Sequence, residues 1–292
     1  MDCSLWGRLK VFGLFEKEDF PKAAFLAYPD KKGPVKMLKT PPYASTCHLV
    51  MNNPGQNRVK RLSKEKKWMK EIAAFLKEHS KSIVFLAFPP EYIDFQPFLW
   101  EGLKVTPQYT YRLDLSKEVA ELEKGMSPER RNDLKRATKD GVEVEAVSDI
   151  NQVEILIQKT FDRKGKSFDQ SFVSKVLQEF ANEGNSIAFI AKYKGCFCAT
   201  SFIIFNSNIA YYIFGGYDSE TTHSGAGALT LWEAIKACRE RGIKTFDFEG
   251  SMLPEVERYF RGFGGEITPY YLVHGSSKAM ETLLKFRNPE LF

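Results

Sequence analysis

The chain has 292 residues and a mass of 33.4 kDa, which is enough for one large domain or for two domains of ordinary size. Hydrophobic residues make up 43% of the sequence and charged residues 27%, so a packed core is possible and wholesale disorder is excluded. The net charge of +5 is unevenly placed, because residues 1–81 hold 17 basic and 8 acidic side chains whereas the remaining residues hold 25 and 29. The excess in the first third indicates an anionic partner, but it is too small to define a nucleic-acid-binding protein.

Cysteines and histidines are few and form no metal-ligand pattern. The five cysteines include one close pair, Cys196 and Cys198, and the four histidines have no paired spacing. We therefore expect reduced thiols and no metal centre. The first 20 residues contain no unbroken apolar stretch, and no run approaches about 20 apolar residues, so we expect a cytoplasmic protein without integral membrane association.

Hydrophobic spacing and turn residues predict an alternation of strands and helices. The first half is expected to hold short strands and turns over 1–57, a helix capped by Ser63 over 63–80, a strand over 83–88, a strand over 109–115 and a helix over 117–140. The second half is expected to hold a strand over 142–147, helices over 150–163 and 169–182, a hairpin of 187–193 and 196–206, a strand over 209–216, a helix over 227–241, and strands over 245–249 and 270–274.

An internal repeat relates the two halves. Four residues have counterparts of similar type 160 positions later: Phe88, Trp100, Gly102 and Leu103 correspond to Phe248, Phe260, Gly262 and Phe263. The order and spacing predict two copies of one α/β unit, which we place at residues 1–143 and 144–292. The alternative is a single large domain with coincidental turns.

A glycine-rich turn precedes the helix predicted over 227–241. Gly225, Ala226, Gly227 and Ala228 follow a predicted strand and open that helix. Backbone N–H groups at such a turn, helped by the helix dipole, can hold a phosphate group. We assign these four residues to binding a phosphate-bearing co-substrate, and the alternative is a tight turn that needs small residues.

Two carboxylates follow on the next predicted strand. Asp247 and Glu249 would share one face of that strand, where they could orient and deprotonate an amine. Arg261 lies among aromatic and glycine residues and could bind phosphate or carboxylate bidentately. The structural alternatives are helix capping or ion pairs of the carboxylates with Arg258 and Arg261, and an ion pair of Arg261 with Glu249 or Glu257.

Two groups of cations are candidate anion contacts. Arg131, Lys135 and Lys139 recur at i, i+4 and i+8, and we assign them to substrate binding together with the aromatic residues Tyr217 and Phe260. The run Arg58–Lys81 has nine Lys or Arg against three Glu and would attract a polyanion such as RNA. A solvated helix face is the alternative for both groups.

Four segments carry a pattern of motifs in a fixed order: Glu129–Val142, Gly225–Ile235, Asp247–Gly250 and Phe260–Gly265. Glu129–Val142 looks like the R-x-x-I-K-K-A-x-K-x-G-V stretch of the FemAB-like proteins. Together the four segments resemble that family within the GNAT acyltransferase superfamily, over roughly residues 80–275.

The resemblance implies an α/β fold with mixed sheets, arranged as tandem GNAT-like acyltransferase domains. Fem ligases move an amino acid from aminoacyl-tRNA onto an amine of a peptidoglycan precursor, and related members are acetyltransferases that use acyl-CoA. The family therefore implies acyl-CoA or aminoacyl-tRNA as a co-substrate, no tightly bound cofactor, and Arg58–Lys81 as the contact for a tRNA. Arg261 stands where Fem ligases usually have Lys, and Thr222 stands where the GNAT pattern has Gln or Arg.

We expect an N-acyltransferase whose active site lies in the second domain. A small-molecule or peptide amine would attack a thioester or ester carbonyl directly, with Glu249 as base and Asp247 orienting. Backbone N–H groups or Arg261 would hold the tetrahedral oxyanion. The alternatives are a non-catalytic GNAT-like binding module and an RNA-binding protein without transferase activity.

Overall fold

The computed structural model describes residues 9–15, 20–52, 57–79, 83–147, 149–163, 170–180, 184–221, 223–250, 252–277 and 280–282. The chain divides into two compact units. The first unit consists of the residues up to 109 together with those from 268 onward, and the second consists of residues 110–267.

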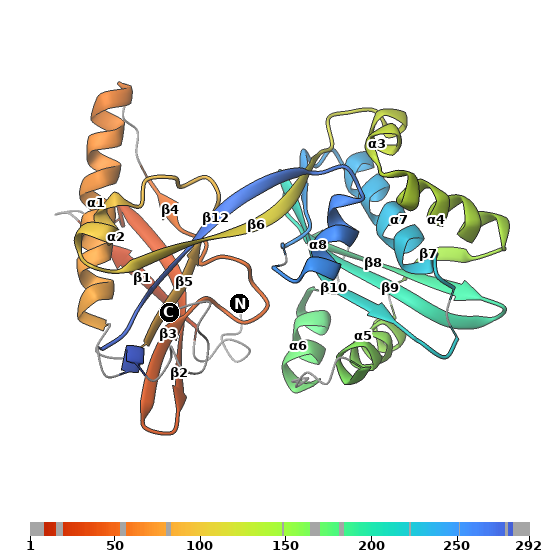
Figure 1. Ribbon diagram of the computed structural model, residues 1–292, viewed down its shortest axis with the longest axis horizontal. Helices are drawn as coiled ribbons and strands as arrows, with labels where there is room; N and C mark the ends of the chain where they lie inside the picture. The colour runs from red at the N-terminus through yellow and green to blue at the C-terminus, as the bar shows by residue number, and fades with distance from the viewer. Residues whose placement is uncertain are drawn as a thin grey trace. The chain divides into compact units, whose positions relative to one another are not determined.

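The first unit contains a mixed sheet with one long helix against it (Figure 1). Its elements are β1 (Lys10–Leu14), β2 (Ala23–Lys32), β3 (Val35–Lys39), β4 (Val50–Met51), α1 (Arg58–His79), β5 (Ile83–Phe88), α2 (Gln96–Trp100), the first part of β6 (Lys104–Asp114) and most of β12 (Glu266–Gly275). The strands follow the order β1-β2-β3-β5-β12, with β4 beside β2. β3 and β5 are parallel, and α1 lies between them in sequence, so this part is a crossover unit.

The second unit repeats this arrangement. Its elements are the rest of β6, α3 (Val119–Gly125), α4 (Pro128–Lys139), β7 (Glu143–Val147), α5 (Asn151–Arg163), α6 (Gln170–Phe180), β8 (Ser186–Tyr193), β9 (Cys196–Phe205), β10 (Ile209–Tyr217), α7 (Ala226–Glu240), β11 (Thr245–Asp247) and α8 (Pro254–Arg261). The strand order is β6-β11-β10-β9-β8-β7, and the parallel pair is now β10 and β11, joined through α7.

Helices cover both faces of the sheet in the second unit. Figure 1 shows α4 and α7 on one face and α5 and α6 on the other. The central strand β9 is accordingly buried without alternation from Cys198 to Ile203, as expected for a strand with apolar neighbours on both sides. The fold is therefore the expected α/β class with mixed sheets, and it consists of two units of similar arrangement.

The two repeats exchange their last strands. β6 follows the first repeat in sequence, yet its residues 112–114 pair with β11 of the second unit. β12 follows the second repeat, and its residues 271–275 pair with β5 of the first unit. Because of this exchange, the contacts divide the chain near 109 and 267. The division at 143/144 predicted from the repeat falls inside the second unit, within β7.

Local signals changed the ends of three predicted elements. α1 begins at Arg58 because Asn57 Oδ1 accepts the Val59 amide at 2.8 Å, and Ser63 lies inside the helix instead of capping it. The helix predicted over 117–140 is two helices, because Ser127 caps α4 and Pro128 occupies its first turn. The strand predicted over 245–249 ends at Asp247. Asp169, where the helix predicted over 169–182 was expected to begin, and the turn residue Thr222 lie outside the described residues.

None of the helices that the structure describes is long and apolar enough to cross a bilayer.

The cysteine thiols differ sharply in exposure. Cys47, Cys198 and Cys238 are buried, Cys196 is exposed, and all four are free. Burial raises the pKa of the Cys198 thiol to about 11 and that of the Cys238 thiol to about 12.

We expect a thiol reagent to label Cys196 rapidly in the native protein and the three buried thiols only after unfolding, because the thiolate is the reactive form. Mass spectrometry of a Cys3→Ser variant, treated with and without urea, measures this. Rapid native labelling of Cys198 would contradict the packing of β9.

Candidate active site

Two parallel strands separate beside the start of α7. β10 and β11 pair only from Ile209 and Thr245 to Tyr211 and Asp247. A bulge between Tyr212 and Phe214 then interrupts the pairing of β10 with β9, and β10 continues past the end of β11, paired with β9 as far as Tyr217. Bulges bend and twist a strand, so the two strands diverge on the side where α7 begins.

Half of the predicted phosphate-binding amides are already engaged. The Gly225 N–H donates to His223 Nδ1 at 3.2 Å, and the Ala226 N–H donates to the His223 carbonyl at 2.9 Å. Because Nδ1 accepts, His223 Nε2 carries the ring proton and donates to Asp140 Oδ2 at 3.0 Å. The N–H groups of Gly227 and Ala228 have no acceptor among the described residues, so these two amides can receive an anion.

The two glycines of the turn have different roles. A Cβ on Gly225 would lie 2.3 Å from the Asp133 carbonyl oxygen and 3.0 Å from Ala137 Cβ, so this glycine lets α7 approach the backbone of α4. A Cβ on Gly227 would meet only the Tyr259 hydroxyl, at 3.7 Å. Gly225 is therefore needed for helix packing, and Gly227 leaves space over the open amides.

We expect Gly225→Ala to lower the free energy of unfolding by about 2–3 kcal/mol, because backbone atoms of α4 cannot move away from the added methyl group. Gly227→Ala is the matched control, and it should leave stability unchanged or raise it by about 0.5–1 kcal/mol through helix propensity. Urea unfolding of both variants measures the difference. Equal effects would show that Gly225 has no special packing role.

Asp247 is a buried carboxylate with three partners. Its side chain is 4% exposed, Oδ2 accepts from Arg112 Nε at 2.7 Å, and Oδ1 accepts from Thr110 Oγ1 at 2.6 Å. Oδ1 also accepts the Glu249 amide at 2.9 Å. The expected ion pair therefore exists, but with Arg112 of β6 and not with Arg258 or Arg261.

Glu249 does not share a strand face with Asp247. The strand has ended, and the backbone of Glu249 has a φ of +63°, a left-handed conformation that is uncommon for a residue with a side chain. The Asp247 carboxylate holds this turn through the Glu249 amide. Such a strained position directly after a buried strand is typical of functional sites.

Arg261 belongs to a second cluster, on the opposite face of β6. Its Nε donates to Glu257 Oε1 at 2.8 Å, and the Tyr111 hydroxyl donates to the same oxygen at 2.5 Å. Tyr111 lies between Thr110 and Arg112, so its side chain points away from the face that holds Asp247. The hydrogen bond from Tyr111 lowers the pKa of Glu257, whereas burial raises that of Tyr111. Arg261 therefore forms the ion pair with Glu257 that was the structural alternative to a binding role. Its side chain is nevertheless 60% exposed.

Tyr259 and Arg130 adjoin the open amides, although neither was predicted as a site residue. The Arg130 guanidinium lies 4.6 Å from the centre of the Tyr259 ring, and Arg130 Nη2 pairs with Asp133 Oδ2 at 2.9 Å. Burial raises the pKa of the Tyr259 hydroxyl far above its usual value, so this group stays a hydrogen-bond donor. Arg130 lies inside the segment Glu129–Val142 and Tyr259 directly precedes the segment Phe260–Gly265, so the family pattern is the signal that could have identified them.

The predicted cation stripe of α4 does not face the glycine turn. The guanidinium of Arg131 donates to two carbonyl groups around the end of α3. Lys135 and Lys139 are exposed, on the side of the helix away from the one that contacts Gly225. They have no ion-pair partner among the residues that the structure describes.

The two predicted aromatic contacts lie in packed surroundings. Phe260 is 8% exposed and its ring lies 5.3 Å from that of Phe248 and 5.9 Å from that of Tyr212. Tyr217 ends β10, where its amide donates to Thr160 Oγ1 at 2.8 Å and the Arg163 guanidinium lies 5.0 Å from its ring centre. Phe260 is a core residue, and Tyr217 packs against α5.

Asp218 fixes the start of the loop between β10 and α7. Its buried carboxylate accepts from Lys159 Nζ at 2.6 Å, from Thr221 Oγ1 at 3.0 Å and from the Glu220 amide at 2.9 Å. The hydrogen bond from Lys159 is the main reason that the pKa of Asp218 lies below its ordinary value.

We expect Asp218→Asn to destabilise the protein at neutral pH and to lose this effect in acid. Because the folded pKa lies below the unfolded value of about 4, the contribution of Asp218 is complete above that value and is lost as the pH falls through the folded pKa. Urea unfolding of both proteins near pH 7 and near pH 3 tests the sign. A difference that is independent of pH would contradict the ion pair.

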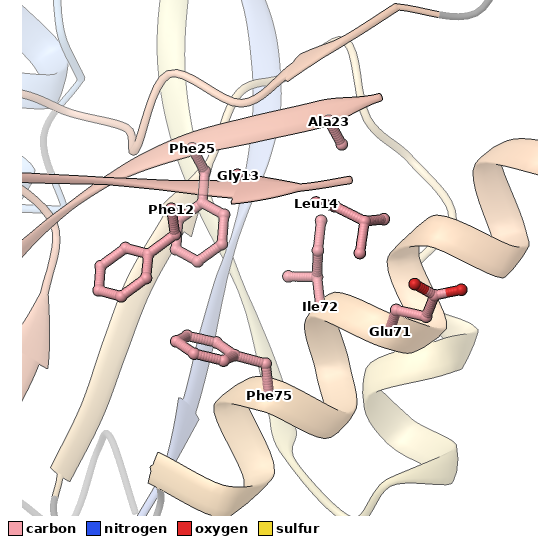
Figure 2. Close-up of a pocket in the computed structure, with 8 residues that line it drawn as sticks. All are labelled: Phe12, Gly13, Leu14, Ala23, Phe25, Glu71, Ile72 and Phe75. Carbon is pink, nitrogen blue, oxygen red and sulfur yellow. The ribbon is translucent and has the colours of Figure 1, made fainter. Parts of the chain in front are cut away.

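A cavity of about 120 Å³ lies in the first unit. Figure 2 shows its lining residues, which come from β1, β2 and α1. Seven of the eight residues that line it carry no polar side-chain atom, and the eighth is Glu71. The lining therefore supplies no side-chain hydrogen-bond donor for a substrate. Among the described residues, no group of three or more His, Cys, Asp or Glu side chains could hold a metal ion.

One family model matches most of the second unit. Residues 128–261 match the model of the acetyltransferase (GNAT) domain, and this segment lies entirely within the second unit. A search of curated protein sequences found none that matches the chain.

Solved structures match nearly the whole chain in fold. FemX aligns with a TM-score of 0.68 and 12% identity, over 97% of this chain and 93% of that one. The C-terminal domain of a putative lysylphosphatidylglycerol synthetase from Agrobacterium fabrum gives 0.60 and 12%, over 95% and 87%. A tandem GNAT protein from the clavulanic acid biosynthesis pathway gives 0.53 and 11%, over 91% and 82%. Residues 128–261 therefore resemble a GNAT acetyltransferase domain, and the chain as a whole shares its fold with FemX and with a tandem GNAT protein.

Proposed function

We propose that this chain is an N-acyltransferase that moves an acyl or aminoacyl group from an activated donor to an amine. The observation that carries the proposal is the pair of open amides, Gly227 and Ala228, at the start of α7 beside two diverging strands. Two adjacent N–H groups at a helix N-terminus suit one phosphate of a donor such as acyl-CoA. The domain match supports acyl transfer as the class of reaction.

In the proposed reaction the amine attacks the carbonyl carbon of a thioester or ester. The new C–N bond forms, the C–S or C–O bond breaks, and the amine proton reaches the leaving group through Glu249 or a relayed water. Asp247 acts as a positioning residue, because it accepts the amide of Glu249. Backbone N–H groups or the exposed guanidinium of Arg261 stabilise the oxyanion. Lys135, Lys139 and Tyr217 remain proposed contacts for the substrates.

The donor and the acceptor are the finer part of the proposal. The likeness in fold to FemX and to a putative lysylphosphatidylglycerol synthetase favours aminoacyl transfer. The match to the acetyltransferase domain favours acyl-CoA as the donor. The acceptor would be a small-molecule or peptide amine, such as one in a cell-wall precursor. Binding of a tRNA would involve the cations of Arg58–Lys81, of which residues 80 and 81 lie outside the described residues.

Titration calorimetry with acetyl-CoA and with aminoacyl-tRNA tests this function directly. Gly227→Val should weaken donor binding by at least about tenfold, because its methyl groups would cover the open amides, and Gly227→Ala is the milder control. Unaltered affinity in a folded Gly227→Val protein would place the donor elsewhere.

A non-catalytic binding module is the second candidate. It is favoured by the engagement of the Gly225 and Ala226 amides and by the full set of structural partners around Asp247. A folded protein that binds neither donor in the titration would support it.

A further inference from the structure

Exposed apolar side chains occur together with cations on α1, on α2 and on the loop before α2 in the first unit. Five of them are unusually accessible: Ile93 at 80%, Val59 at 70%, Trp100 at 61%, Leu99 at 54% and Leu62 at 45%. We call these residues, with the cations of Arg58–Lys70, the α1–α2 surface.

Lys66 of α1 contacts residues of α2 and of the loop before it. Its ammonium group lies 2.7 Å from Gln96 Oε1 and 3.0 Å from Asp94 Oδ2, and 5.2 Å from the centre of the Trp100 ring. Val59 and Leu62 lie seven and four residues before Lys66 and therefore on the same face of α1. The apolar residues of α1 and α2 thus belong to one patch.

The surface is strongly positive. Seven of the thirteen residues from Arg58 to Lys70 are Lys or Arg, and only Glu65 is acidic. Glu65 lies near Arg61, at 3.8 Å, while Lys60, Lys64 and Lys70 have no ion-pair partner among the described residues. Every residue from Arg58 to Lys64 is exposed, so the first two turns of α1 project from the unit (Figure 1).

We propose that the α1–α2 surface docks on an anionic lipid bilayer. Its cations would lie at the headgroup phosphates, while the aliphatic side chains and the Trp100 ring enter the boundary with the acyl chains. An RNA would neutralise the same cations and could stack a base on Trp100, but it would leave four aliphatic side chains without an apolar partner. A bilayer accommodates both kinds of side chain, and this docking is independent of the acyl transfer proposed for the second unit.

Sedimentation with vesicles tests the proposal on the full chain. The vesicles contain phosphatidylcholine alone, or phosphatidylcholine and phosphatidylglycerol in equal amounts. We expect binding to the anionic vesicles that is at least about tenfold tighter than to the neutral ones and that weakens with salt. Lys60→Gln combined with Lys64→Gln should lower the affinity and the salt dependence.

A matched pair of variants separates apolar insertion from simple charge attraction. Leu62→Ser and Ile155→Ser each remove an aliphatic side chain that is 45% exposed, and neither changes the net charge. Leu62→Ser, alone and with Val59→Ser, should weaken vesicle binding several-fold, whereas Ile155→Ser on α5 should not.

Two outcomes would overturn the proposal. One is a wild-type protein that does not sediment with anionic vesicles. The other is a Leu62→Ser protein that binds them as well as Ile155→Ser does. A gel-shift with tRNA is run in parallel, and tRNA binding that Leu62→Ser weakens, without vesicle binding, would assign the surface to RNA.

Discussion

Replacing Asp247 by asparagine is expected to lower the free energy of unfolding by about 3 kcal/mol. The carboxylate is almost fully buried, and its Oδ2 accepts from Arg112 Nε at 2.7 Å. In the variant, the side-chain NH₂ group of asparagine takes the place of Oδ2, so two hydrogen-bond donors face each other. The bonds from Thr110 and from the Glu249 amide can persist, since an asparagine oxygen still accepts. The loss is therefore mainly that of the charge pair, and urea unfolding measures it.

Asp114→Asn is the matched control for this variant. Asp114 lies on the same strand β6, is exposed, and accepts from the amide and hydroxyl of Ser116. Its replacement should change stability by no more than about 0.5 kcal/mol. In a double-mutant cycle, Arg112→Met should reduce the effect of Asp247→Asn, because no guanidinium is then left beside residue 247 without its ion-pair partner. Strictly additive effects would show that the pair does not interact.

Elements set by local residues were predicted well from the sequence. The β8–β9 hairpin follows from Lys194 and Gly195, which both take positive φ, at 51° and 80°. α7 ends where Gly242 takes a φ of 79°. The break in the helix predicted over 117–140 was also readable from Pro128, but hydrophobic periodicity on both sides concealed it.

Strand pairing was not readable in the same way. The repeat correctly indicated two related units, but a strand pattern does not say which neighbour the strand will pair with. β6 and β12 each pair in the unit of the other repeat, so a boundary placed by linear order falls inside the second unit. The boundary between the two units is therefore known only once the pairing of β6 and β12 in the sheet is known.

The contacts within the candidate site could likewise not be predicted from local sequence patterns alone. The sequence pointed to the turn before α7 and to Asp247, both of which lie near the diverging strands. The partner of Asp247 is 135 residues away, on β6, and no local spacing connects it to Arg112. Which amides stay open is likewise decided by the contacts of His223 and by the packing of Gly225 on α4.

Glu249→Gln is expected to lower turnover by about 10²–10⁴-fold at neutral pH, the usual contribution of a general base. Glutamine is nearly isosteric, so the fold should not change. Turnover is measured with the donor that the titration identifies and with an amine acceptor. Glu143→Gln, on the exposed face of β7, is the control and should retain full activity. Equal turnover of Glu249→Gln and wild type at every pH would contradict the role as base.

The backbone of Glu249 supplies a second, independent test of that role. A residue with a side chain at a φ of +63° is strained, and glycine relieves that strain. We therefore expect Glu249→Gly to be more stable than wild type by about 0.5–1 kcal/mol and yet inactive. A stabilised but inactive variant would indicate that this carboxylate is kept at a cost in stability for the chemistry of the site. If Glu249→Gly were instead destabilised with its activity intact, Glu249 would be a structural residue, and the base would have to be sought elsewhere around the open amides of α7.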